Sequence, residues 1–356
     1  MAITFCLFSC SVTKLNKDSQ IQPIENIKKE NISETTAVQN TLTSPYSQVV
    51  SNTVELFEAI SKIPPQGGTI TIKAGIYLIN KEMHINRSNV TLKGEKGVLF
   101  ELNKNANVPV ILIGTDKETP TKDDVIKNIK ISDIEINGLM KYQSSELVKG
   151  KPWIRNNGID IRAVDNLWVD NVDIYNCRSG GIVASWHSSR IFITNSSFHN
   201  NFFDGIALYD SEDIHISNVN CYGNVGAGVS LDNNLRDVLF NGGIIKNNRD
   251  VGIFVRDSEN IAFHNLQISN NGNSGCFMAH SVYGSTNEII PNSGVKRLYF
   301  QGCRFIGNKG YGIALASEKD MSPGNSVVSC LFADNKYGPI NDPHDIINKV
   351  SNIYQK

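Results

Sequence analysis

The sequence predicts an all-β solenoid, in which short strands wind around one core and successive coils stack in parallel. Two observations predict it. A segment of the form Gly-apolar-x-apolar returns every 23 or 24 residues, and an asparagine stands four residues before most of these glycines. The repeats begin at Gly158, Gly181, Gly205, Gly228, Gly252 and Gly275, and later copies begin at Gly312 and Gly338.

Each repeat has room for three short strands. The first follows the glycine, and residues 214–216 and 219–221 are examples of the second and third, with alternating apolar residues. A propeller blade needs about 40–45 residues, and neither a helical period nor a leucine-rich frame is present. The remaining architecture is a solenoid of three-stranded coils, stacked about 4.8 Å apart. The repeated asparagines suit the turns, because Asn tolerates a left-handed backbone and its amide can bond to the next coil.

The region before the repeats predicts the entry to the solenoid. Residues 54–60 have helical spacing and would cap its open end. They are followed by Gly67-Gly68-Thr69-Ile70 and Ala74-Gly75-Ile76-Tyr77. Together with the repeats, these segments resemble the pectate-lyase-like superfamily, over residues 49 to about 345. The resemblance implies a right-handed single-stranded parallel β-helix with an N-terminal capping helix and action on polysaccharides, and it identifies no particular family.

The N-terminal residues predict export. Residues 1–10 resemble a bacterial lipoprotein signal with Cys10 as the lipidated residue, although no Lys or Arg precedes the apolar run and a disordered N-terminus is the alternative. Residues 11–48 are polar and predict a flexible linker. The β-helix is expected over 49–345 and a tail over 346–356. We therefore expect an exported protein, anchored to the bacterial outer membrane, in the periplasm or on the cell surface.

Composition excludes several classes of protein. The formal net charge is −1, and the lack of Lys/Arg-rich runs argues against nucleic-acid binding. No dinucleotide, haem or phosphate-binding motif is present, and membrane contact is expected only through the N-terminal lipid. We expect a monomer. The repeats contain five cysteines without metal-ligand spacing, which predicts buried free thiols, with the last two stacked on each other: Cys177, Cys221, Cys276, Cys303 and Cys330.

The outward face of the strand after each repeat glycine predicts the functional site. The second and fourth residues after the glycine point away from the core, and the fifth lies where the strand bends. Charged, aromatic and amide side chains gather there, as in sugar-binding sites. Longer insertions at 114–125, 139–157, 281–294 and 317–325 flank the same strand. We expect substrate binding by Asp160, Arg162, Trp186, His187, Asn233 and Tyr283, and catalysis by Tyr209, Asp232, Arg256 and His280.

Three reactions on a polysaccharide fit these residues. In a lyase, Arg256 or Arg162 neutralises a uronate carboxylate and Tyr209 or His280 moves the proton. Ca²⁺, which many pectate lyases use, would bind at Asp210 and Asp257, with Asp232 as a further ligand. Asp210-Ser211 and Asp257-Ser258 stand at equal places in their repeats, however, so both aspartates are also expected as turn residues.

A glycoside hydrolase is the second reaction, with Asp210 and Asp232 about 5 Å apart as its carboxylate pair. The third is epimerisation, because Asp342-Pro343-His344-Asp345 resembles the Asp-Pro-His motif of mannuronan C5-epimerases. Its place in the last coil is equally that of a turn. A protein that binds glycans or builds a surface without catalysis is the alternative of another class. We place the lyase slightly ahead.

Overall fold

The computed structural model describes residues 45–355, except 283–289, 291–292, 317–323 and 344. The predicted signal with Cys10 and nearly all of the predicted linker lie outside the described residues. So do Tyr283 and His344. Within the described part of the chain, no helix is long and apolar enough to cross a membrane.

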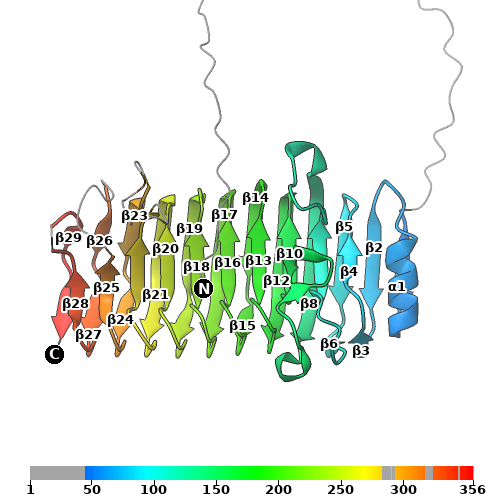
Figure 1. Cartoon of the computed structure of the whole chain (residues 1–356), viewed down its shortest axis with the longest axis horizontal. Coiled ribbons are helices and arrows are strands. Elements are labelled where there is room, and N and C mark those ends of the chain that lie inside the picture. Colours follow the sequence, from blue (N-terminus) through cyan, green and yellow to red (C-terminus); the bar gives the residue numbers. More distant parts are fainter. Residues whose placement is uncertain (1–44, 283–289, 291–292, 317–323, 344, 356) are drawn as a thin grey trace, which may run out of the picture. The chain divides into compact units, whose positions relative to one another are not determined.

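Two sheets run along the solenoid (Figure 1). One, here called the short-strand sheet, contains the strand that follows each repeat glycine. All its pairings are parallel, and equal repeat positions lie side by side, so that Tyr209 pairs with Asp232. Its strands are β4 (Met83–Ile85), β7 (Ile111–Gly114), β11 (Ile159–Arg162), β13 (Ile182–Ser185), β16 (Ile206–Tyr209), β18 (Val229–Asp232), β20 (Ile253–Arg256), β22 (Cys276–Ala279), β25 (Tyr311–Leu315) and β28 (Gly338–Asn341).

The other, here called the wrapping sheet, forms the rest of each coil. It contains β1 (Ser47–Val50), β2 (Gly68–Ile72), β3 (Gly75–Ile79), β5 (Val90–Gly94), β6 (Val98–Leu102), β8 (Ile126–Asn137), β12 (Val164–Tyr175), β14 (Ser188–Thr194), β15 (Ser197–His199), β17 (Ser211–Tyr222), β19 (Arg236–Lys246), β21 (Glu259–Ser269), β23 (Lys296–Gln301), β24 (Arg304–Ile306), β26 (Ser326–Val328), β27 (Leu331–Ala333), β29 (Asn348–Val350) and β30 (Ile353–Gln355).

The predicted second and third strands are often one continuous strand with a bend. β12, β17 and β21 each run through both positions, and a left-handed residue marks the bend. Asn171, Asn218 and Asn265 hold φ of 52°, 53° and 58° there. Asn adopts this conformation more readily than other residues with a Cβ. The bend thus turns the chain around the core without ending the strand.

The core consists of side chains stacked from coil to coil. Ile, Val and Leu of both sheets are fully buried, and phenylalanines continue the stack toward the C-terminal end. The ring of Phe263 lies 5.0 Å from that of Phe240 and 4.8 Å from that of Phe300. The predicted capping helix is present as α1 (Thr53–Ser61). It buries Leu56 and Ala59 against the first coils, and Asn52 accepts the Glu55 N–H as its N-cap.

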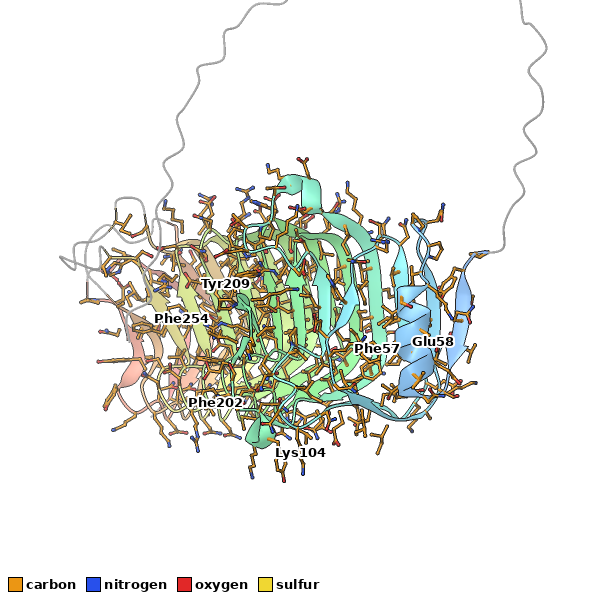
Figure 2. All side chains as sticks on the ribbon, turned by 45° about the vertical axis from the view of Figure 1, so that its right-hand side comes forward. Phe57, Glu58, Lys104, Phe202, Tyr209 and Phe254 are labelled. Carbon is orange, nitrogen blue, oxygen red and sulfur yellow. The ribbon has the colours of Figure 1, made fainter. Side chains whose placement is uncertain are left out.

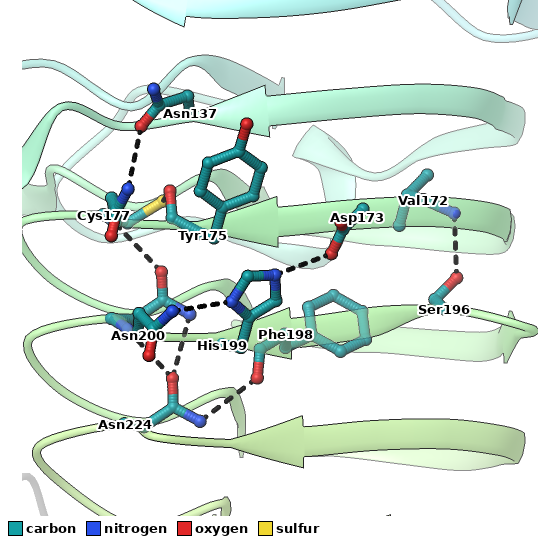
Figure 3. A network of polar contacts seen from close by, with 12 residues as sticks. Asn137, Val172, Asp173, Tyr175, Cys177, Ser196, Phe198, His199, Asn200 and Asn224 are labelled. Atoms are coloured by element: carbon teal, nitrogen blue, oxygen red, sulfur yellow. Dashed lines mark hydrogen bonds and ion pairs between the residues drawn. The ribbon is translucent and has the colours of Figure 1, made fainter. Parts of the chain in front are cut away.

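The repeated asparagines form a buried ladder. The side chain of each accepts the backbone and amide N–H of the asparagine one coil before it. Asn248 Oδ1 accepts Asn224 N at 3.1 Å and Asn224 Nδ2 at 3.0 Å. Asn224 Nδ2 also donates to the Phe198 carbonyl, as Figure 3 shows. The ladder comprises Asn201, Asn224, Asn248, Asn271, Asn308 and Asn335. It satisfies the polar backbone at one corner of every coil.

Two predicted boundaries are wrong. The expected tail after residue 345 continues the β-helix, because β29 and β30 pair in parallel with β26 and β27. The β-helix also begins two residues before 49, because β1 starts at Ser47 and pairs with β2. β1, β29 and β30 are only three or four residues long, which is too short to show a clear alternating pattern. The five cysteines of the repeats are buried and free, as predicted, and Cys303 lies against Cys330.

Candidate functional site

Two insertions cover part of the short-strand sheet, and Arg162 holds them. The guanidinium donates to the carbonyls of Thr115 at 3.2 Å, Lys117 at 2.6 Å and Trp153 at 3.3 Å. Its residue is only 3% exposed. Trp153 in turn donates its indole N–H to the Asp116 carbonyl at 2.9 Å. Arg162 was expected to bind substrate, whereas the structure uses its donors on the backbone of the insertions.

The second insertion ends in a β-hairpin, formed by β9 (Leu147–Val148) and β10 (Lys151–Arg155). The hairpin is antiparallel, unlike the stacked coils. Lys151 pairs with Asp116 of the first insertion. The two insertions therefore form one covering layer, which places the residues after β10 beside the outward face of β11 and the next coils.

Three expected catalytic residues lie together on consecutive coils. Asp232 accepts both Nε and Nη2 of Arg256, at 2.9 and 2.5 Å. Tyr209 stands directly beside Asp232 in the parallel register. The Arg256 guanidinium also lies 5.7 Å from the ring of Phe254, which Figure 2 shows on the same side of the solenoid as Tyr209. The Nη1 group of Arg256 takes no part in this bidentate pair.

The surroundings of Tyr209 favour a neutral phenol. Burial raises its pKa well above the usual range, and the carboxylates of Asp204 and Asp232 raise it further. Ser230 contacts the phenol. Burial also raises the pKa of Asp232, although the Arg256 ion pair opposes that effect. A phenol in this setting is a proton donor rather than a base.

Two carboxyl groups near this site, one buried and one half-buried, were only partly foreseen. Asp204 was missed, and Asp160 was expected to bind substrate. Burial raises the pKa of each to about 6. Asp204 accepts the Ala227 N–H at 2.7 Å, and Asp160 accepts an amide N–H of Asn157 at 3.0 Å. The signal for Asp204 was its place before a repeat glycine, where the neighbouring coils carry Gly180 and Ala227. We call Tyr209, Asp204, Ser230, Asp232 and Arg256 the Tyr209 cluster.

The raised pKa of Asp160 predicts a stability that depends on pH. Between about pH 4 and 6 the folded protein keeps a proton that the unfolded chain has lost, so its stability falls as the pH rises through this window. Asp160→Asn removes this loss. We expect the variant to gain about 1–3 kcal/mol relative to the wild type between pH 4 and 7, measured by urea unfolding. Asp334→Asn, at an exposed position, is the control, and parallel pH profiles for all three proteins would contradict the prediction.

The fifth-position residues are turn residues. Left-handed φ, between 42° and 62°, occurs at Trp186, Asp210, Asn233 and Asp257, and also at His187, one position later. Trp186 and His187 are consecutive, and Trp, unlike His, Asn and Asp, is not a residue type that is enriched in this region. The backbone therefore supports the turn interpretation of Asp210 and Asp257. Trp186, His187 and Asn233 remain predicted substrate contacts.

The expected calcium ligands do not converge. Both carboxylate oxygens of Asp257 bind the 281–294 insertion, through Ser281 and the Gly294 N–H at 2.7 Å. The oxygens of Asp232 bind Arg256, and Asp210 lies 3.6 Å from His187 Nδ1. No group of three His, Cys, Asp or Glu residues that could hold a metal occurs among the described residues. These side chains do not fit a calcium ion.

Two further predicted features are separate from Tyr209 itself. His280 follows Ala279, which pairs with Arg256 in the parallel register, and it lies three strands along from Tyr209, about 14 Å at the usual strand spacing. Of the motif at residues 342–345, the structure describes Asp342, Pro343 and Asp345, in the last coils. Asp342 accepts the N–H groups of Ile346 at 3.1 Å and Ile347 at 2.9 Å, and pairs with Lys349 at 2.7 Å. Its carboxylate is thus engaged by neighbouring residues.

Parallel coils of this kind define the class of right-handed parallel β-helix proteins. The model of the family described as "Right handed beta helix region" matches residues 110–265 and 236–348, and the chain belongs to this family. No curated protein sequence matches it.

Several solved structures share the fold. The Geobacillus virus E2 protein ORF18 has a TM-score of 0.67 and 15% identity over 85% of this chain and 58% of its own. An alginate lyase from Paenibacillus sp. has a TM-score of 0.63 and 12% identity over 85% of this chain and 99% of its own. The A-module of a mannuronan C-5 epimerase from Azotobacter vinelandii has a TM-score of 0.60 and 15% identity over 88% and 94%. At these identities the likeness is one of fold.

Proposed function

We propose that this protein acts on a polysaccharide and cleaves a uronate-containing polymer by β-elimination at the Tyr209 cluster. The observation that carries the proposal is the half-buried neutral phenol of Tyr209 beside the Asp232–Arg256 pair. Two of the similar folds are named as an alginate lyase and a mannuronan epimerase, which agrees with a polyuronate as substrate.

The reaction needs a cation at the carboxylate, a base and an acid. Arg256 Nη1, which lies outside the pair with Asp232, neutralises the substrate carboxylate and so acidifies the adjacent C5–H. The carboxylate of Asp204, with a pKa raised to about 6, takes the C5 proton. The C–H electron pair forms the C4–C5 double bond as the C4–O4 bond breaks. Tyr209 donates its proton to the leaving O4 oxygen.

The other reactions fit these contacts less well. For a hydrolase, Asp232 would have to act while both its oxygens bind Arg256, and Asp210 lies in a turn beside His187. An epimerase shares the first step, removal of the C5 proton, but returns a proton to the other face instead of expelling O4. A glycan-binding protein without catalysis needs none of the raised pKa values.

The test uses the full purified chain with polygalacturonate, alginate, glycosaminoglycans and neutral glycans. Ultraviolet absorbance of the unsaturated product and reducing ends are followed together. We expect both to rise on a polyuronate. Reducing ends without absorbance would identify a hydrolase, and silence in both signals with altered C5 configuration by NMR would identify an epimerase. Either outcome overturns the lyase proposal, as does silence in all three.

A further inference from the structure

Arg155 is the basic residue that the β9–β10 hairpin brings to the Tyr209 cluster. It is the last residue of β10, three positions before the repeat glycine at 158. Its guanidinium lies 5.3 Å from the ring of Phe203, which directly precedes Asp204. Its backbone N–H is in contact with the carboxylate of Asp160. The hairpin therefore fixes the start of this side chain, while its end rests on a neighbouring coil.

The charge of Arg155 is only weakly neutralised within the protein. Its Nη1 lies 3.7 Å from Glu146 Oε2, whereas Arg178 approaches the other oxygen of Glu146 to 3.0 Å. The Arg155 side chain is 41% exposed, compared with 23% for Arg178. Arg178 also packs more closely on its aromatic neighbour, at 4.0 Å from the ring of Phe202. Of the two arginines that share Glu146, Arg155 is thus the one free to bind an anion from solvent.

The field of Arg155 reaches the groups that the elimination requires. Its charge lowers the pKa of Asp160, Asp204 and Tyr209, although burial outweighs this effect at each of them. Arg155 and Arg256 therefore approach the same cluster from different elements: Arg155 lies on the hairpin, and Arg256 lies on a coil of the solenoid. A polymer with a carboxylate on every sugar presents more than one anion to such a site.

We propose that Arg155 forms a second carboxylate subsite beside the Tyr209 cluster, which binds the carboxylate of a uronate residue next to the one that reacts. The planar guanidinium matches a carboxylate with two parallel hydrogen bonds. The exposed ring of Phe203 lies under the guanidinium and holds it in place. The class of ligand, an acidic polysaccharide, is taken from the proposed function, on which this inference rests. The subsite makes binding of the acidic sugar depend on the β9–β10 hairpin, which is not part of the repeats.

Binding of matched ligands tests the subsite without relying on cleavage. Tetramers of galacturonate, mannuronate and guluronate are titrated calorimetrically, each beside its carboxyl-reduced neutral counterpart. All proteins carry Tyr209→Phe, which is expected to slow turnover by at least about 10²-fold. We expect the parent to bind one acidic tetramer more tightly than its neutral counterpart. Arg155→Ala should weaken binding of that acidic tetramer about tenfold to hundredfold and leave the neutral one unchanged.

Arg178→Ala is the matched control, because it removes the same charge, the same Glu146 partner and a similar ring contact. We expect it to bind like the parent. Equal losses in the two variants, an equal loss for acidic and neutral tetramers, or a parent that binds none of the acidic tetramers would each overturn the subsite. Selective binding without cleavage by the wild type would reject the lyase and keep the subsite. Cleavage with unchanged binding in Arg155→Ala would do the reverse.

Discussion

Tyr209→Phe is expected to lower kcat on the cleaved polymer by about 10²- to 10⁴-fold, the usual contribution of a positioned proton donor. The change removes only the hydroxyl group, so the ring still fills its place between the coils. Substrate binding should persist, because the phenol contributes mainly to the transition state. Initial rates from the unsaturated product, with KM and kcat determined separately, measure the effect.

Tyr222→Phe provides the control for this variant. Tyr222 lies on the outward side of β17, where its ring stacks 4.5 Å from that of His199 in the wrapping sheet. Loss of that hydroxyl should leave both kinetic constants unchanged. If Tyr209→Phe kept more than a tenth of the wild-type kcat, Tyr209 would not be the acid, and His280, the other predicted proton carrier, would be changed next.

Asn248→Ala is expected to lower the free energy of unfolding by about 3–5 kcal/mol. The Asn248 amide is fully enclosed and links three coils. It accepts from Asn224 and donates to the Cys221 carbonyl at 3.2 Å and to Asn271 Oδ1 at 3.0 Å. Alanine leaves the Asn224 N–H and the Cys221 carbonyl without these partners in a buried place. Urea unfolding followed by circular dichroism measures the loss.

Asn220→Ala is the control that distinguishes loss of the ladder from the effect of replacing any asparagine by alanine. Asn220 lies on the outward side of β17, and its side chain makes no hydrogen bond with any described residue. We expect a change within about 0.5 kcal/mol. A similar loss in the two variants would mean that the buried asparagine ladder adds no special stability.

Most of the fold could be predicted because every repeat shows the same sequence pattern. The glycine, the alternating strand and the buried asparagine recur at fixed places, so the sequence itself contains several copies of the same evidence. The last coil was missed where this signal weakens: after Gly338, the two wrapping-sheet strands β29 and β30 have only three residues each. The bend inside β17 was also missed, because Asn218 was expected to separate two strands rather than to lie within one.

Only those contacts of the site could be predicted that follow from the parallel register of the coils. Tyr209, Asp232 and Arg256 stand at the same repeat position on consecutive coils, and the structure brings them together. Arg162 shares that position but is covered, because the insertions that bury it belong to no repeat. Arg155 comes from such an insertion. Its approach depends on how the hairpin folds back, which no periodicity in the sequence encodes.

The equal spacing of the coils also affects how genes for such a chain can change length. Duplication or deletion of a whole repeat preserves the alignment of glycines and asparagines, and each added coil lengthens the solenoid by about 4.8 Å. The Tyr209 cluster does not share this freedom, since its members come from three successive coils. A duplication between residues 209 and 256 would keep the fold but separate the proton donor from the arginine. Lengthening is therefore compatible with the proposed activity only on either side of that segment.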